Sequence, residues 1–209
     1  MTFAQVSTWD GTWAPWTYGT GTEQDPFLIE NAQQLAYLAY RVNNGLDAGG
    51  GHVSNHDYHY KLMVDVNLNG SEDFQWTPVG DWNSDSDYQC FGGYFDGNDY
   101  TIVGLFINSS VNRAGLFGYT NEASIANLSV YGSVSVNGGN AGGLVGFAVS
   151  THVGNSNNYC TISVIGFGNS GGIIGAASES TSVINCLNFE DVSSSNDYDT
   201  YSGGIIGLT

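Results

Sequence analysis

Short apolar runs separated by glycine and polar turn residues fill the chain after residue 45. One glycine-framed phrase returns four times, as "AGLFG" at 114–118, "AGGLVG" at 141–146, and "SGGIIG" at 170–175 and 202–207. Its closing residues are 28, 29 and 32 positions apart and are Gly118, Gly146, Gly175 and Gly207. Periods of this length are typical of solenoids, in which each repeat buries its apolar face against its neighbours.

A second phrase keeps register with the first. It reads "SIANLSVYGSVS" at 124–135, "HVGNSNNYCTIS" at 152–163 and "SVINCLNFEDVS" at 182–193. Apolar positions align at Ile125, Val153 and Val183, and asparagines align at Asn127, Asn155 and Asn185. Short β-prone runs bury an apolar face by stacking on the equivalent strands of the next repeat, ~4.8 Å away.

We therefore predict an all-β fold, a right-handed parallel β-helix, in which the aligned asparagines form a ladder of side-chain amides. The repeated glycines are expected where the backbone needs a positive φ or approaches the neighbouring coil closely.

A single amphipathic segment, "NAQQLAYLAYRVNNG" at 31–45, has helical spacing. Asn31 is a good N-cap with Gln34 three residues later, and Gly45 is a helix terminator. We predict a helix over 31–44 that covers the N-terminal end of the β-helix, because open strand edges invite association. The chain then divides into an N-terminal segment, 1–57, and β-helix coils over 58–209, which together form one structural domain.

The net charge and the composition limit the kinds of partner that the chain can bind and favour one cellular location. The chain has 20 Asp and Glu against 3 Lys and Arg, a net charge of −17, which excludes nucleic acid and disfavours anionic membrane surfaces. No stretch approaches the ~20 apolar residues of a membrane span. Few lysines and many Asn, Ser, Thr and Gly favour an extracellular or cell-surface location. We expect an export signal to be missing ahead of Met1, and either more chain or another subunit after Thr209.

Three cysteines, Cys90, Cys160 and Cys186, leave at least one thiol unpaired. We favour three buried thiols, with a Cys160–Cys186 disulfide as the alternative.

The glycine phrases and the apolar-x-Asn phrases together resemble the GLUG motif of large bacterial surface proteins. That motif occurs in surface regions of IgA-specific metallopeptidases and in adhesin-like proteins of gut bacteria. The segments "GTEQDPFLIENAQQLAYLAYRVNNG" at 21–45, "WTPVG" at 76–80 and "FDGNDYTIVGL" at 95–105 are also similar to such proteins. The resemblance covers about residues 19–207, and it implies the architecture and extracellular display but no particular activity.

Catalytic signatures are weak, and we predict that the chain is not an enzyme. A zinc peptidase needs His-Glu-x-x-His, but "HVSNH" at 52–56 has Val53 in the place of the glutamate. A polysaccharide hydrolase or lyase needs paired carboxylates or a base with a cation. Asp96, Asp99 and the acidic loop at 81–87 offer carboxylates, whereas the cations are only Arg41, Lys61 and Arg113.

The loop "DWNSDSDY" at 81–88 is the candidate calcium site, with Asp81, Asn83, Asp85 and Asp87 at alternate positions. It is not an EF-hand, because Ser86 and Gly92 replace the required glycine and glutamate. A solvated loop without a metal is the alternative, and no other cofactor is expected.

Tryptophans give the candidate ligand-binding residues: Trp13, Trp16, Trp76 and Trp82. Exposed, these rings would stack on sugars or anchor a protein, whereas the alternative is burial within the cap.

The predicted function is that of a non-enzymatic extracellular module of a bacterial cell-surface protein, acting in adhesion or as a stalk or presentation repeat. Its partner would be a host or environmental glycan or protein. One alternative is a carbohydrate-active β-helix that binds or cleaves polysaccharide. The second is a filament subunit that self-associates end to end through an uncapped C-terminal coil.

Overall fold

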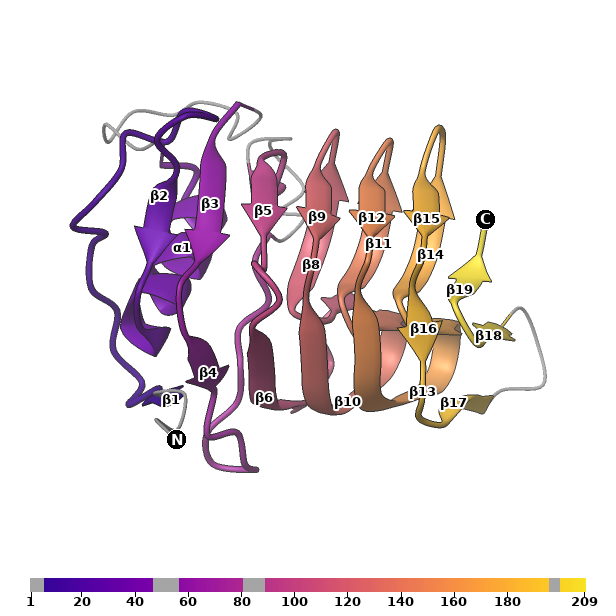
Figure 1. The fold of residues 1–209 in the computed structure, drawn as a ribbon. Helices are drawn as coiled ribbons and strands as arrows, with labels where there is room; N and C mark the ends of the chain where they lie inside the picture. The colour runs from indigo at the N-terminus through magenta and orange to yellow at the C-terminus, as the bar shows by residue number, and fades with distance from the viewer. Residues whose placement is uncertain (1–5, 47–56, 81–88, 196–199) are drawn as a thin grey trace.

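The computed structural model describes residues 6–46, 57–80, 89–195 and 200–209. The chain forms a parallel β-solenoid of about six turns, with one short helix near its N-terminus (Figure 1). The predicted parallel β-helix with an N-terminal helix is therefore confirmed.

Three parallel sheets form the sides of the solenoid. Sheet I contains β1 (Val6–Thr8), β4 (Asp65–Asn67), β6 (Thr101–Ser109), β7 (Arg113–Ala114), β10 (Ser129–Gly142), β13 (Asn157–Gly171), β16 (Leu187–Asn188), β17 (Val192–Ser195) and β18 (Thr200–Gly203). Sheet II contains β2 (Phe27–Ile29), β3 (His59–Leu62), β5 (Tyr94–Asp96), β9 (Ser124–Ala126), β12 (His152–Gly154) and β15 (Ser182–Ile184). Sheet III contains β8 (Phe117–Asn121), β11 (Val145–Val149), β14 (Ile174–Ser178) and β19 (Ile206–Leu208).

Residues that align in the repeats are direct neighbours across the sheets. Val153 on β12 pairs with Ile125 on β9 and with Val183 on β15. Ile125 and Val153 are fully buried, so the apolar position of the second phrase forms an inward ladder. The sequence period thus equals one turn of the solenoid.

The asparagine ladder is also present. The Nδ2 of Asn155 donates to the Oδ1 of Asn127, and the Nδ2 of Asn185 donates to the Oδ1 of Asn155, each over 3.2 Å. All three residues have a positive φ between 48° and 59°, which asparagine tolerates better than most residues. The ladder extends one coil further than predicted, because the Nδ2 of Asn127 donates to the Oδ1 of Asp96 over 2.9 Å.

The phrase glycines are explained by close approach between coils. A Cβ at Gly146 would lie 2.6 Å from the backbone nitrogen of Ala114, and one at Gly175 would lie 2.6 Å from that of Ala141. None of the glycines in the four phrases has a positive φ. Of the two reasons expected from the sequence, close approach is confirmed and the left-handed backbone is wrong at these positions.

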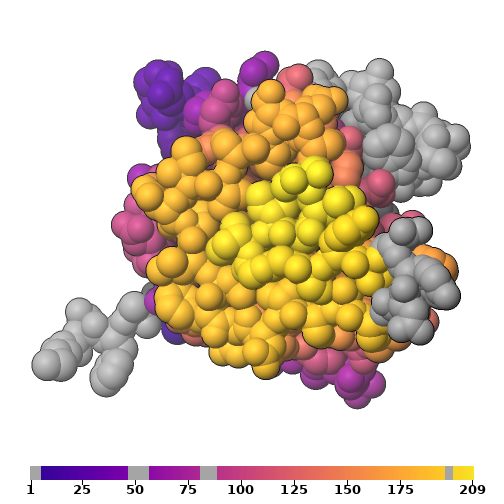
Figure 2. All heavy atoms as spheres, turned by 90° about the vertical axis from the view of Figure 1, so that its right-hand side faces the viewer, coloured from indigo at the N-terminus to yellow at the C-terminus, as the bar shows by residue number. Residues whose placement is uncertain are grey.

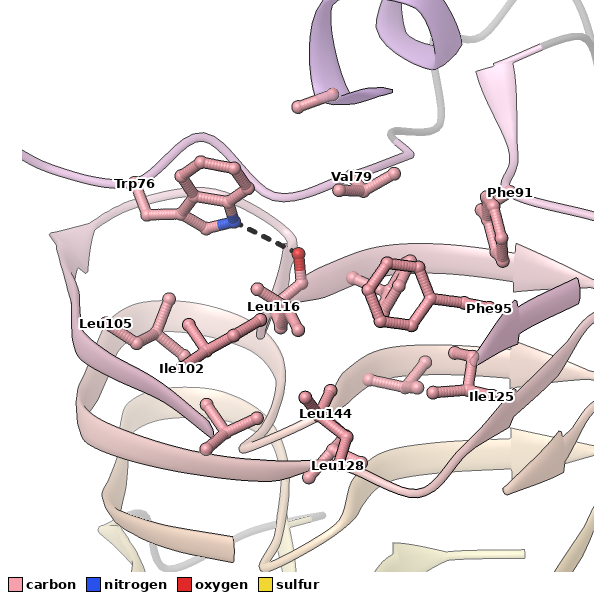
Figure 3. Close-up of a cluster of buried hydrophobic side chains, with 14 of the residues drawn as sticks. Trp76, Val79, Phe91, Phe95, Ile102, Leu105, Leu116, Ile125, Leu128 and Leu144 are labelled. Carbon is pink, nitrogen blue, oxygen red and sulfur yellow. Dashed lines mark hydrogen bonds between the residues drawn. The ribbon is translucent and has the colours of Figure 1, made fainter. Parts of the chain in front are cut away.

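The core fills the space between the three sheets. Figure 3 shows part of it, where Leu116 and Leu144 from the corners before sheet III face Phe95 and Ile125 from sheet II. These four side chains are at most 2% exposed.

The helix α1 (Ala32–Asn43) lies at the N-terminal end, behind β2 and β3 in Figure 1. The Oδ1 of Asn31 accepts from the backbone N–H of Gln34 as expected for an N-cap, while the Oε1 of Gln34 accepts from the backbone N–H of Glu30. Leu35, Leu38 and Val42 are fully buried against the first coils. No helix in the described ranges is long and apolar enough to cross a membrane.

The last coil forms an open end, seen face-on in Figure 2. β15, β16 and β19 are edge strands, and no strand in the described ranges pairs with their outer sides. Ile184, Leu187 and Phe189 are each more than half exposed there. Unpaired strand edges favour association. End-to-end stacking of two chains stays a prediction, and sedimentation at rising protein concentration would test it.

The cysteine thiols give a probe of this fold. Cys160 and Cys186 are unbonded, so the disulfide alternative is wrong, and Cys186 is only half-buried where we expected a buried thiol. Burial chiefly raises the pKa of Cys160, with Glu190 adding to the effect, and burial also raises the pKa of Cys186.

We expect Cys186 to react slowly with a thiol reagent at pH 8, and Cys160 to react only when the whole solenoid unfolds, because a fully buried thiol is neither accessible nor ionised. Timed alkylation followed by peptide mass spectrometry measures both rates, with Cys186→Ser as the control. Equal native-state rates for the two thiols would contradict the fold around β13.

Candidate functional site

An exposed aromatic platform lies on α1. The indole of Trp13 stacks on the ring of Tyr40 at 4.3 Å and 15°, and on that of Tyr37 at 5.3 Å and 29°. The two tyrosines are three residues apart, so the helix places them on one face. Trp13 remains 48% exposed, and it therefore offers a flat apolar surface to solvent.

Next to this platform is a pocket of about 250 Å³. Trp9, Trp13 and Trp76 line it from the strand side, and Ala36, Ala39 and Tyr40 line it from α1. Thr12, Asn43, Asn44 and Thr77 supply its polar groups. The pocket thus combines aromatic walls with a few hydrogen-bonding side chains, which is the usual composition of a small-molecule site.

Hydrogen bonds hold the polar groups of the pocket in place. The carboxylate of Asp10 accepts from the hydroxyl of Thr12 at 2.7 Å and from its backbone N–H at 3.0 Å. These bonds lower the pKa of Asp10, because they stabilise the charged form. Asn43 donates to the carbonyl of Pro78 at 2.9 Å and accepts from the N–H of Gly80 at 2.7 Å. The rim is therefore preorganised and carries both donors and acceptors.

Two of the predicted tryptophans belong to the packing. Trp76 is only 3% exposed, and its Nε1 donates to the carbonyl of Leu116 over 3.0 Å (Figure 3). Trp16 is half-buried, and it stacks on Phe27 at 4.6 Å and meets Tyr37 edge-on at 4.8 Å. Trp76 and Trp16 therefore follow the burial alternative, and ligand contact by either ring stays a prediction.

Trp13 and Trp76 of the predicted set both line the pocket, and they are joined by Trp9, a neighbouring tryptophan of the N-terminal segment, and by Tyr40, which the sequence reasoning missed. The three-residue spacing of Tyr37 and Tyr40 on a predicted helix was the signal that could have found the platform. Trp82 and the four candidate calcium ligands, Asp81, Asn83, Asp85 and Asp87, lie outside the described residues. Elsewhere, in the ranges that the structure describes, no group of three His, Cys, Asp or Glu side chains could hold a metal ion.

The three cations lie in separate places. Arg41 is buried in α1, and its Nη1 donates to the hydroxyl of Tyr37. Arg113 lies over the ring of Tyr119 at 5.2 Å, and Lys61 lies 3.5 Å from the carboxylate of Asp96. Asp96 is therefore a carboxylate considered for catalysis that does have a cation nearby.

Comparison with known proteins finds relatives that are much longer than this chain. No protein family model matches the chain. It is 35% identical over 142 residues to the "Putative Gly-rich membrane protein" of Evansella cellulosilytica, covering 65% of this chain and 14% of the relative. It is 29% identical over 175 residues to "Halomucin" of Haloquadratum walsbyi, covering 79% of this chain and 2% of the relative.

Among solved structures, a "putative immunoglobulin A1 protease" from Bacteroides ovatus matches with a TM-score of 0.60 and 22% identity, over 92% of this chain and 64% of that one. This likeness shows a shared fold. The chain therefore spans less than two thirds of each of these three proteins, and only a small part of the two curated relatives.

Proposed function

We propose that the chain is a non-enzymatic, extracellular module of a much longer bacterial cell-surface protein, in which it acts as a stalk or presentation repeat and contributes to adhesion. The observation that carries the proposal is the series of side-chain ladders that tie each coil to the next on the outside of the solenoid.

The ladders occupy outward positions that a binding or catalytic surface would otherwise use. Besides the Asn127–Asn155–Asn185 ladder, Asn169 donates to Asn140 over 2.8 Å. In addition, the buried Asn158 donates to Asn188 over 2.8 Å, which ties two coils together from within. Tyr131, Tyr159 and Phe189 stack with ring centroids 4.2 and 4.5 Å apart. Contacts between nearest-neighbour coils make a solenoid extendable by simple repetition, which suits a spacer.

Two further observations support an external location. The charge of −17 keeps a long chain soluble and repels anionic surfaces. The relatives are far longer than the segment that this chain matches, and one of them is named as a membrane protein.

Surface display tests the presentation role. A host cell would carry the chain between a membrane anchor and a short peptide tag, and antibody-coated beads would report access to the tag. We expect bead capture to exceed that of a glycine-serine linker of about 30 residues, whose r.m.s. length of about 30 Å equals the rise of about six coils at about 4.8 Å each, because the solenoid holds the tag at a fixed height whereas such a linker is a random coil. Equal capture by the two would contradict the proposal.

The non-enzymatic part is tested separately with a panel of neutral and uronate polysaccharides. We expect no release of reducing ends or unsaturated uronate above that of the heat-denatured chain. Turnover that is lost on denaturation would overturn this part and favour the carbohydrate-active alternative.

Carbohydrate binding at the aromatic pocket is the second candidate function, and the exposed face of Trp13 favours it. A glycan array, probed with and without calcium, would identify a ligand. Trp13→Ala should then lower its affinity by about tenfold or more, since stacking area is lost. Tyr18→Ala is the matched control, because Tyr18 is 61% exposed in the same segment and does not line the pocket. Equal effects of the two variants would count against this site.

A further inference from the structure

A row of outward side chains crosses sheet II at one register position. It consists of His59, Tyr94, Ser124, His152 and Ser182, on β3, β5, β9, β12 and β15. The rings of His59 and Tyr94 stack with centroids 4.2 Å apart and planes within 5°. The row therefore begins as an aromatic stack of the same kind as Tyr131, Tyr159 and Phe189 on sheet I.

This stack stops after two rings. The next residue in the row is Ser124, whose side chain is too small to cover the second face of Tyr94. Because His59 occupies one face, the other face of Tyr94 is turned along the sheet towards β9 and β12. Tyr94 is 45% exposed, which agrees with an uncovered ring.

The gap at Ser124 has the size of one ring. Tyr94 and His152 are two strand spacings apart, about 9.6 Å, so that a ring midway would lie at the normal stacking distance from its neighbours. On the far side, the Nδ1 of His152 lies 2.9 Å from the Oγ of Ser182, and its Nε2 would be 2.9 Å from a Cβ at Gly154. His152 thus leans away from Ser124 and leaves the gap open.

Polar groups lie along one side of the gap, two residues further along the strands. Lys61 and Asp96 are paired at 3.5 Å and are both more than a third exposed. The other oxygen of Asp96 accepts from the N–H of Asn98 and from the Nδ2 of Asn127, each at 2.9 Å, so the carboxylate is held in one position. The next residue in this second row is Ala126, which leaves space above the strand.

These side chains line a groove of about 570 Å³, with Glu23 and Gln24 on its rim. The groove contains one lysine against two carboxylates, in a chain of net charge −17, so it disfavours an anionic ligand. A fixed carboxylate and an ammonium suit hydroxyl groups, which both donate and accept hydrogen bonds. An uncovered aromatic face suits a flat apolar surface.

We propose that this groove binds an uncharged saccharide, with one pyranose ring inserted above Ser124 against the free face of Tyr94 and its hydroxyls bonded to Asp96 and Lys61. The site lies on the side of the solenoid and is separate from the aromatic pocket on α1. It assigns one class of ligand, uncharged saccharides, to the proposed adhesive module. The inference rests on the proposed function only in assuming that the module is extracellular, and the binding itself does not depend on that location.

Titration calorimetry of the whole chain with cellohexaose, xylohexaose, mannohexaose and hexagalacturonate tests the site. We expect at least one neutral oligosaccharide to bind and the uronate not to bind. Ser124→Tyr should abolish this binding while the chain stays folded, because the new ring occupies the gap and continues the stack. Tyr94→Ala should weaken binding about tenfold.

Thr161→Tyr is the matched control for added bulk, since Thr161 is exposed on a strand of sheet I, and it should leave the affinity unchanged. Binding that survives both Ser124→Tyr and Tyr94→Ala would overturn the inference, as would the absence of any neutral ligand or a preference for the uronate. Binding lost in Trp13→Ala but kept in Ser124→Tyr would assign the ligand to the aromatic pocket instead, and would also overturn it.

Discussion

Replacing Gly143 by alanine should lower the free energy of unfolding by about 3 kcal/mol, the upper range for overpacking a rigid core. A Cβ at this position would collide with the Oδ1 of Asn158 and would lie 2.8 Å from the carbonyl of Gly172. Asn158 cannot move aside without cost. It is fully buried, exchanges two hydrogen bonds with the backbone of Cys160 at 2.9 and 3.0 Å, and donates to Asn188 at 2.8 Å.

Gly204→Ala is a matched control within the same chain. Gly204 is also the second glycine of its phrase, but nothing lies within 4 Å of a Cβ built there, because no described coil covers it. Its replacement should change the unfolding free energy by less than about 0.5 kcal/mol. Urea unfolding followed by circular dichroism measures both variants. Similar losses of unfolding free energy at the two positions would contradict this explanation. They would show that glycine is needed for its backbone conformation and not because the neighbouring coil leaves no room for a Cβ.

The fold could be predicted from the sequence because its repeats stack in register. In a parallel stack, residues one period apart lie in the same place on successive coils, so the alignment of Asn127, Asn155 and Asn185 already implied the hydrogen bonds between them. The period also implied sheet neighbours such as Ile125 and Val153. A repeated pattern carries three-dimensional information because one contact rule applies at every turn.

The candidate sites lacked such a rule. Trp13 and Trp76 belong to the non-repeating part of the chain, where exposure depends on how residues 9–16 fold across α1 and on the Leu116 carbonyl that accepts from Trp76. The groove on sheet II depends on the register of β5 against β9, which places Ser124 beside Tyr94. The early coils are less regular than the later ones, so this pairing could not be read from the period. The candidate calcium loop lies outside the described residues.

Replacing Trp76 by alanine should cost about 4 kcal/mol of unfolding free energy, as expected for truncating a buried tryptophan. The ring packs edge-on against Trp9 at 5.4 Å, and its Nε1 donates to the Leu116 carbonyl at 3.0 Å, next to the core of sheet III. Its loss would leave a cavity between the first coils and α1, while the Leu116 carbonyl would keep the hydrogen bond that it accepts from the backbone N–H of Val79 at 3.0 Å. Trp76→Phe keeps most of the packing but not the donor, and because the Leu116 carbonyl still accepts from Val79, it should cost about 1 kcal/mol.

The contrast with Trp13 separates the structural tryptophan from the candidate binding one. Trp13→Ala removes a ring that is 48% exposed, and it should cost about 1 kcal/mol or less, since only its stacking on two tyrosines is lost. Urea unfolding followed by circular dichroism ranks the three variants without relying on tryptophan fluorescence. A larger loss for Trp13→Ala than for Trp76→Ala would reverse the assignment, because it would make the exposed platform part of the fold and remove the main reason to regard it as a ligand surface.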